Sequence, residues 1–127
     1  MTNFLSIITA IHLAALSQIE TGDNAKAVGK DGERTRYQIS PEAARSEFKM
    51  SLAKLCQLPK AELDGRMNEV WTARVAVFRL QNDRYPTLPE TYLLWHRPAR
   101  VLNPRPREKE RAARFMNLVL DMQRKRQ

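Results

Sequence analysis

Residues 61–83 read AELDGRMNEVWTARVAVFRLQND and contain the longest uninterrupted helical hydrophobic pattern in the chain. The large apolar side chains of this stretch recur at steps of three and four, at Met67, Val70, Trp71, Val75 and Phe78. That spacing places them on one side of a helix. We therefore expect a central core helix from about Ala61 to Asp83, with Trp71 inside the core.

Shorter helices are expected on both sides of this segment. Ser40, Pro41 and Glu42 supply a hydroxyl cap, a proline at the first helical position and an acid at the positive helix end, which predicts a helix reaching residue 50. A short helical piece to residue 58 follows and is ended by Pro59. Downstream, a brief helix is expected over 90–96, and the last helix is expected from about Arg107. The prolines at 98, 104 and 106 predict an extended crossing between these two helices.

The beginning of the chain combines one helix with an irregular segment. Phe4, Ile8, Ile11, Ala15 and Ile19 form a stripe on a helix that ends near Glu20, with Thr2 or Asn3 as its cap. Residues 21–37 hold three of the four glycines and are expected to form an irregular loop or a short β-hairpin. The sequence thus predicts a mostly α-helical single domain over residues 1–127. The final helix carries its own stripe, at Ala112, Phe115, Val119 and Met122, which can close the core or dock on a partner.

The chain is basic, with 22 Lys and Arg against 14 Asp and Glu and a formal charge of +8. Such a surface attracts nucleic acid, anionic lipid or bacterial wall polymer, and charge alone does not choose among them or exclude a merely solvated basic face. The single Cys56 has leucine neighbours and is expected to be a buried thiol. Since His12 and His96 lie far apart, no metal site is expected, and no cofactor.

The first nineteen residues are apolar, but they lack the basic start of a signal sequence. They are also too short and too polar to span a bilayer. We expect no membrane span.

Glu20 is the first candidate for chemistry, because it stands where the apolar helix meets the glycine-bearing loop. Partial desolvation at such a junction disfavours the charged carboxylate, so the group can act as a proton donor at neutral pH. The alternative is an ordinary glutamate on the surface at a helix end.

Two stretches in the first third of the chain carry a family resemblance. SQIETGDN at 17–24 resembles the E-S-G-x-N signature of lytic transglycosylases and goose-type lysozymes. AVG at 27–29, Gly32 and RYQISP at 36–41 resemble that family's A-V-G … G … G-L-M-Q-I-x-P segment. A weaker match is LWHRPARV at 94–101, which resembles the family's A-Y-N-A-G-P-x-R-V block.

This resemblance implies a lysozyme-like fold and an enzyme that cleaves the β-1,4 bond between N-acetylmuramic acid and N-acetylglucosamine in peptidoglycan. Glu20 would be the single general acid and base. An ordinary glycosidase needs a second carboxylate. The loop acids Asp23, Asp31 and Glu33 can be considered for it, but the single-acid mechanism is favoured. The expected substrate-binding residues are Asn24, Tyr37, Gln38, Trp95 and His96.

The same resemblance implies that the partner is the peptidoglycan glycan strand. We expect the chain to be a monomer. It would work in the periplasm or at the cell wall once an export signal has been removed. Otherwise a phage or a secretion system would deliver it.

Three departures from the family pattern keep alternatives open. Thr35 stands where the family has a glycine before its groove glutamine, and His96 stands for the family's groove asparagine. One residue of the family's A-G-P block is also missing after His96. One alternative keeps the fold but only binds wall glycan, without catalysis. The other is a basic helical module whose arginine-rich final helix binds nucleic acid through phosphates.

Overall fold

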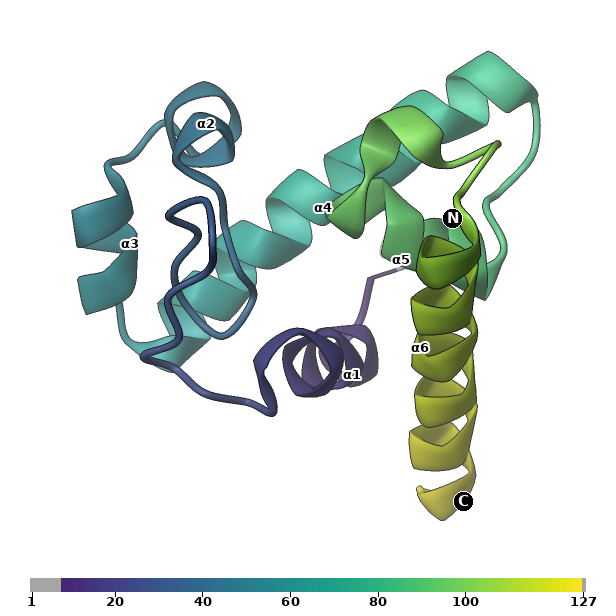
Figure 1. Cartoon of the computed structure of the whole chain (residues 1–127), viewed down its shortest axis with the longest axis horizontal. Coiled ribbons are helices and arrows are strands. Elements are labelled where there is room, and N and C mark those ends of the chain that lie inside the picture. Colours follow the sequence, from purple (N-terminus) through teal and green to yellow (C-terminus); the bar gives the residue numbers. More distant parts are fainter. Residues whose placement is uncertain (1–7, 127) are drawn as a thin grey trace, which may run out of the picture.

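The fold is an arrangement of helices around one long central helix (Figure 1). The computed structural model describes residues 8–126, and within them the regular secondary structure is helical, as predicted. The helices are α1 (Ala10–Thr21), α2 (Pro41–Ala43), π-helix η2 (Ala44–Phe48), α3 (Leu52–Gln57), α4 (Lys60–Asn82), α5 (Leu88–His96), 3-10 helix η3 (Pro98–Arg100) and α6 (Pro106–Lys125).

Helix α4 is the predicted core helix, and its bounds differ from the predicted ones by one residue at each end. Its predicted stripe is buried, and Trp71 is 0% exposed. The indole nitrogen of Trp71 donates to the carbonyl oxygen of Thr91 in α5 at 2.8 Å, which ties the two helices together. The expectation that Trp71 belongs to the core is confirmed.

Helix α4 crosses the molecule and carries different elements along its length (Figure 1). The loop after α1, together with α2 and α3, lies over its first half, whereas α5 and α6 lie on the opposite side of α1. Helix α6 packs against α1 and α5 and buries Ala112, Phe115 and Val119. Its apolar stripe therefore closes the core of this chain.

The first helix begins later than the stripe predicted. Thr9 is its N-cap, and the backbone N–H of Thr9 donates to Nδ1 of His12 at 3.1 Å. The side-chain amide of Asn68 donates to the carbonyl oxygen of Ile8 at 2.7 Å, which gives that carbonyl a partner outside the helix. The predicted caps Thr2 and Asn3 lie outside the described residues.

The predicted helix start is confirmed, because Ser40 caps α2 and Pro41 is its first residue. The helix then continues as π-helix η2 and ends at Phe48, short of the predicted residue 50, with Lys49 at a φ of 54°. Two other local expectations are wrong. Cys56 is exposed, because its neighbour Leu55 takes the buried side of α3 and a residue one step along a helix points elsewhere. The predicted extended crossing instead forms η3 and a turn, since Pro98 suits the first position of a helix.

The β-hairpin that was one option for the insert is not formed. Antiparallel bridges join Val28 with Arg34 and Arg34 with Ile39, and both are isolated. The insert is an irregular loop, which was the other option.

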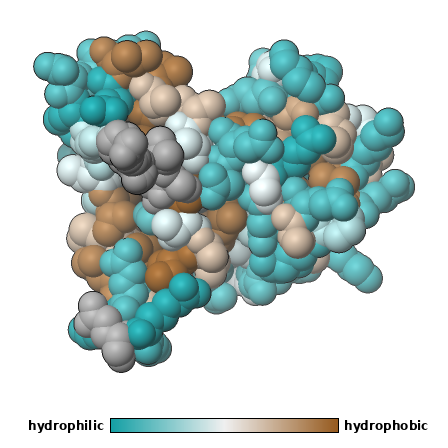
Figure 2. Space-filling view, turned by 180° about the vertical axis from the view of Figure 1, so that it is seen from behind, coloured by the Kyte–Doolittle hydropathy of each residue, from teal (hydrophilic) through white to brown (hydrophobic). Residues whose placement is uncertain are grey.

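The exposed apolar side chains are unevenly distributed. Figure 2 shows more brown, hydrophobic surface over the half built from the end of α4, α5 and α6 than over the other half. Val77 and Leu80 of α4, Leu102 and Leu120 are exposed there. None of the helices in the described part of the chain has the length and hydrophobicity of a membrane-spanning segment.

Trp71→Phe is expected to lower the free energy of unfolding by about 2–4 kcal/mol, because it leaves a cavity and removes the indole hydrogen bond to the Thr91 carbonyl oxygen. Leu80→Ala is the control, and it should change that energy by about 0.5 kcal/mol or less because Leu80 is 86% exposed. Urea denaturation followed by circular dichroism measures both. Equal stability losses in the two variants would contradict the central role of Trp71.

Candidate active site

The end of α1 delivers Glu20 to the interior of the molecule. The helix stops at Gly22, whose φ of 64° lies in the left-handed region, and the Gly22 N–H donates to the carbonyl oxygen of Gln18 at 3.0 Å. Glu20 thus stands in the last turn, where its side chain leaves the helix toward α5 and α6. Only 7% of that side chain is exposed.

Three side chains from two other helices surround the Glu20 carboxylate. The Tyr92 hydroxyl donates to Oε2 at 2.8 Å, and Nη2 of Arg111 donates to the same oxygen at 2.7 Å. Nδ1 of His96 lies 3.4 Å from Oε1. The imidazole stacks on the Tyr92 ring, with 5.2 Å between ring centroids, so α5 holds both groups in register.

These contacts decide the protonation state of Glu20. Burial raises its pKa, but His96, Tyr92 and Arg111 together lower it by more, and the net pKa lies below the ordinary value for glutamate. The expectation of a carboxyl group that stays protonated at neutral pH is therefore wrong for the free protein. The apolar helix face was its only basis, whereas the donors come from α5 and α6.

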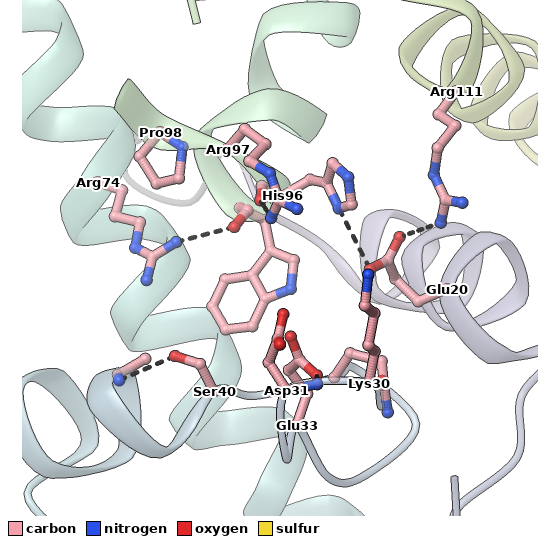
Figure 3. Close-up of a pocket in the computed structure, with 13 residues that line it drawn as sticks. Glu20, Lys30, Asp31, Glu33, Ser40, Arg74, His96, Arg97, Pro98 and Arg111 are labelled. Carbon is pink, nitrogen blue, oxygen red and sulfur yellow. Dashed lines mark hydrogen bonds and ion pairs between the residues drawn. The ribbon is translucent and has the colours of Figure 1, made fainter. Parts of the chain in front are cut away.

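Glu20 lines a pocket of about 390 Å³ between the loop, α4, α5 and α6. Figure 3 shows Glu20 with His96 and Arg111 on one wall, and Lys30, Asp31 and Glu33 rising from the loop on another. Two of the loop acids considered as a second carboxylate thus share the pocket with Glu20. The third, Asp23, does not line it and instead accepts from Ser17 at 2.6 Å and Arg36 at 2.9 Å.

Gln38 lines the same pocket as Glu20, but its amide nitrogen is used inside the loop. It donates to the carbonyl oxygens of Thr35 at 3.1 Å and Ala27 at 3.4 Å. A Cβ added at Gly29 would meet the ends of the Gln38 and Glu33 side chains. A larger residue at position 29 would therefore displace these two side chains, both of which line the pocket.

Thr35 adopts the backbone conformation that the family's glycine suggested. Its φ is 71°, a region that L-residues with a branched Cβ rarely occupy. Its hydroxyl accepts from the Tyr37 N–H at 3.2 Å, and its carbonyl oxygen accepts from the Gln38 N–H at 3.1 Å. Local hydrogen bonds offset the backbone strain, so the turn forms without glycine.

The aromatic candidates differ in placement. Tyr37 is 1% exposed and donates to Asp64 at 2.5 Å, so its ring has no face toward the pocket, contrary to the prediction that it binds a sugar. Trp95 lines the pocket at 7% exposure, with its indole nitrogen donating to the Tyr37 carbonyl oxygen at 3.0 Å.

Asn24, the remaining predicted substrate-binding residue, is exposed and lies off this pocket. Its side-chain oxygen accepts from the Lys26 N–H at 2.9 Å in a turn.

Arg74 fixes the far wall of the pocket, and no feature of the sequence pointed to this residue. Its Nη1 donates to the carbonyl oxygens of Leu94 at 2.9 Å and Trp95 at 3.1 Å, and its guanidinium lies 4.7 Å from the Trp95 ring centroid. The other guanidinium nitrogens bind Glu47 of η2. Arg74 therefore positions Trp95 and the end of α5.

Arg111 and Tyr92 are the other residues of the Glu20 environment that could not be found from the sequence. Arg111 is 91 positions from Glu20, and no motif connects them. In a basic helix with several arginines, nothing in the local sequence indicates which guanidinium turns inward.

Among residues 8–126, no group of three or more His, Cys, Asp or Glu side chains is placed to hold a metal ion.

Comparisons of the chain with protein-family models, curated proteins and solved structures find no match.

Thr35→Gly is expected to be about 1 kcal/mol more stable than Thr35→Ala, because both lose the hydroxyl but only glycine relieves the positive φ. The same pair at Thr72, inside α4, should show the reverse order by about 1 kcal/mol, since glycine is unfavourable within a helix. Urea unfolding of the four variants measures the two differences. Alanine being the more stable residue at both positions would contradict a strained Thr35.

Proposed function

We propose that the protein cleaves the β-1,4 glycosidic bond between N-acetylmuramic acid and N-acetylglucosamine in peptidoglycan, with Glu20 as the general acid and base. The observation that carries the proposal is that segments far apart in the sequence meet at one pocket. Glu20, Gln38 and His96 come from the three blocks that resemble the lytic transglycosylase family, and all three line this pocket.

The chemistry assigned to Glu20 uses both of its protonation states. The protonated carboxyl donates to the glycosidic oxygen, and the resulting carboxylate then withdraws a proton as the product closes on itself or is hydrolysed. In the free protein, Tyr92 and Arg111 stabilise the carboxylate form through charge-assisted hydrogen bonds. Burial raises the pKa of the Tyr92 hydroxyl, so this group stays protonated and donates.

A second candidate function is glycan binding without cleavage. It is favoured by the ion pair with Arg111, because in the free protein this contact holds Glu20 in the form that cannot donate a proton. A pocket with the same lining would then bind a glycan strand and release it unchanged. Release of fragments distinguishes the two functions.

Glu20→Gln is expected to reduce the release of soluble fragments from purified sacculi by about 10²–10⁴-fold, the usual contribution of a general acid. Mass spectrometry of the fragments measures it, and also distinguishes anhydromuramic ends from hydrated ends. Glu62→Gln, on the exposed first turn of α4, is the matched control and should leave the release unchanged. Sacculus binding without release by the wild-type protein would establish the second candidate.

The value of kcat/KM should be highest at acidic pH and should fall as the pH rises through the Glu20 pKa, since only the protonated carboxyl donates. Tyr92→Phe removes one of the groups that lower this pKa, so the falling limb should move to higher pH. Tyr85→Phe, at a tyrosine outside this pocket, should leave the profile in place. Coincident profiles for wild type and Tyr92→Phe would contradict the assignment of the limb to Glu20.

A further inference from the structure

We propose that Arg111 recognises a carboxylate carried by the glycan substrate, and that this contact draws the guanidinium away from Glu20. The inference rests on the proposed function, which it deepens by naming the substrate class. The preferred strand is one that bears a carboxylate next to the scissile bond, in contrast to a neutral polymer of N-acetylglucosamine.

The placement of Arg111 is the first support. Its side chain is 32% exposed and lines the pocket, whereas the Glu20 side chain behind it is far more buried. Nε donates to the Tyr92 hydroxyl at 3.0 Å, and Nη2 is directed at Glu20 and, at 3.4 Å, at the Ile19 carbonyl oxygen. Nη1 makes no hydrogen bond to any residue from 8 to 126. The guanidinium therefore reaches the pocket with donor capacity left.

The second support is the competition that a bound carboxylate creates. A guanidinium binds carboxylates through paired parallel hydrogen bonds, so a ligand carboxylate at Nη1 competes for Nη2 with Glu20. When Glu20 loses this donor and gains a negative neighbour, its protonated form is favoured. Substrate binding would thus convert the resting carboxylate into a proton donor.

The other groups around Glu20 do not replace Arg111 in this role. From α5, His96 approaches Oε1 and Tyr92 donates to Oε2, and both contacts can persist when Arg111 moves. From the loop, Lys30 lines the pocket, as do the acids Asp31 and Glu33. His96 also lines the pocket, but its ring is stacked on Tyr92. Arg111 contacts Glu20 with a permanently charged guanidinium, and its Nη1 makes no hydrogen bond to residues 8–126.

N-acetylmuramic acid carries the required chemistry. Its lactyl ether ends in a carboxyl group, which is a free carboxylate on peptide-free strands and an amide where a stem peptide is attached. The peptide brings carboxylates of its own. The neutral N-acetylglucosamine tetrasaccharide has a similar backbone and no carboxylate, so it lacks the group that Arg111 would bind.

The experiment measures binding with defined tetrasaccharides at neutral pH by the change in tryptophan fluorescence, since Trp95 lines the pocket. The ligands are a peptide-free muramyl tetrasaccharide, the same compound with its lactyl groups as methyl amides, a peptide-bearing form, and the N-acetylglucosamine tetrasaccharide. The wild-type protein should bind the free acid about tenfold more tightly than the methyl amide, as expected for a charge-assisted pair.

Arg111→Gln should bring the affinities for acid and methyl amide to within about twofold of each other, because the charged donor is gone. Arg111→Lys keeps a positive charge beside Glu20 and is the second test variant, to be used if Arg111→Gln folds poorly. It should retain only part of the preference, because lysine lacks the guanidinium fork. Arg114→Gln, on the same helix but outside this pocket, should keep the full preference.

A second readout follows the Glu20 carboxyl carbon by NMR. The pKa of the Glu20 carboxyl group should rise when the free acid binds and should not change when the methyl amide binds. Tight binding of the peptide-bearing form that depends on Arg111 would identify a peptide carboxylate as the ligand group. Weak binding of that form would identify the free lactyl group.

Equal affinities of the wild-type protein for acid and methyl amide would overturn the proposal, as would a full preference in Arg111→Gln. Failure of the proposed function would look different. No ligand would then be cleaved at any pH, while the affinity ratio of acid to amide would still report on Arg111.

Discussion

The burial of one carboxylate constrains the arrangement of three helices. A charge as buried as that of Glu20 is tolerated only when hydrogen bonds and an opposite charge compensate for its lost hydration. Tyr92 of α5 and Arg111 of α6 supply this compensation at 2.8 and 2.7 Å. Because each donor belongs to a different helix, α6 must pack on α1 and α5 must come close enough for the Tyr92 side chain to reach the end of α1. The same packing forms one wall of the pocket.

The opposite side of the pocket depends on a second arginine. Arg74 joins α4 to the last carbonyl groups of α5 and, through Glu47, to the π-helix η2. Single π-turns inside helices often occur at functional sites. Here the last residue of the π-helix is Phe48, whose ring packs edge to face against the Trp95 indole, with 6.2 Å between ring centroids. The indole is thus held from two sides, which gives the pocket a preformed wall.

Sequence reasoning predicted best where the pattern is local. The stripe of α4 is dense and periodic, so its helix and the burial of Trp71 could be predicted, and the glycines placed the loop after Glu20. Contacts between distant segments left no such signal. The protonation state of Glu20 depends on Arg111, and an aromatic type alone does not distinguish the buried Tyr37 from the pocket-lining Trp95. Thr35 shows a further limit, because a positive φ was compatible with a residue other than glycine.

The ionised resting state of Glu20 is compatible with acid catalysis once the strength of the acid is considered. A lower pKa means that each protonated carboxyl transfers its proton more readily, but that fewer molecules are protonated at neutral pH. The donors that lower the pKa also stabilise the carboxylate that remains after the transfer. A site of this kind works well in two circumstances. Either the surroundings are acidic, or the substrate itself removes one of the donors, and Arg111 lines the pocket, where a substrate can reach it.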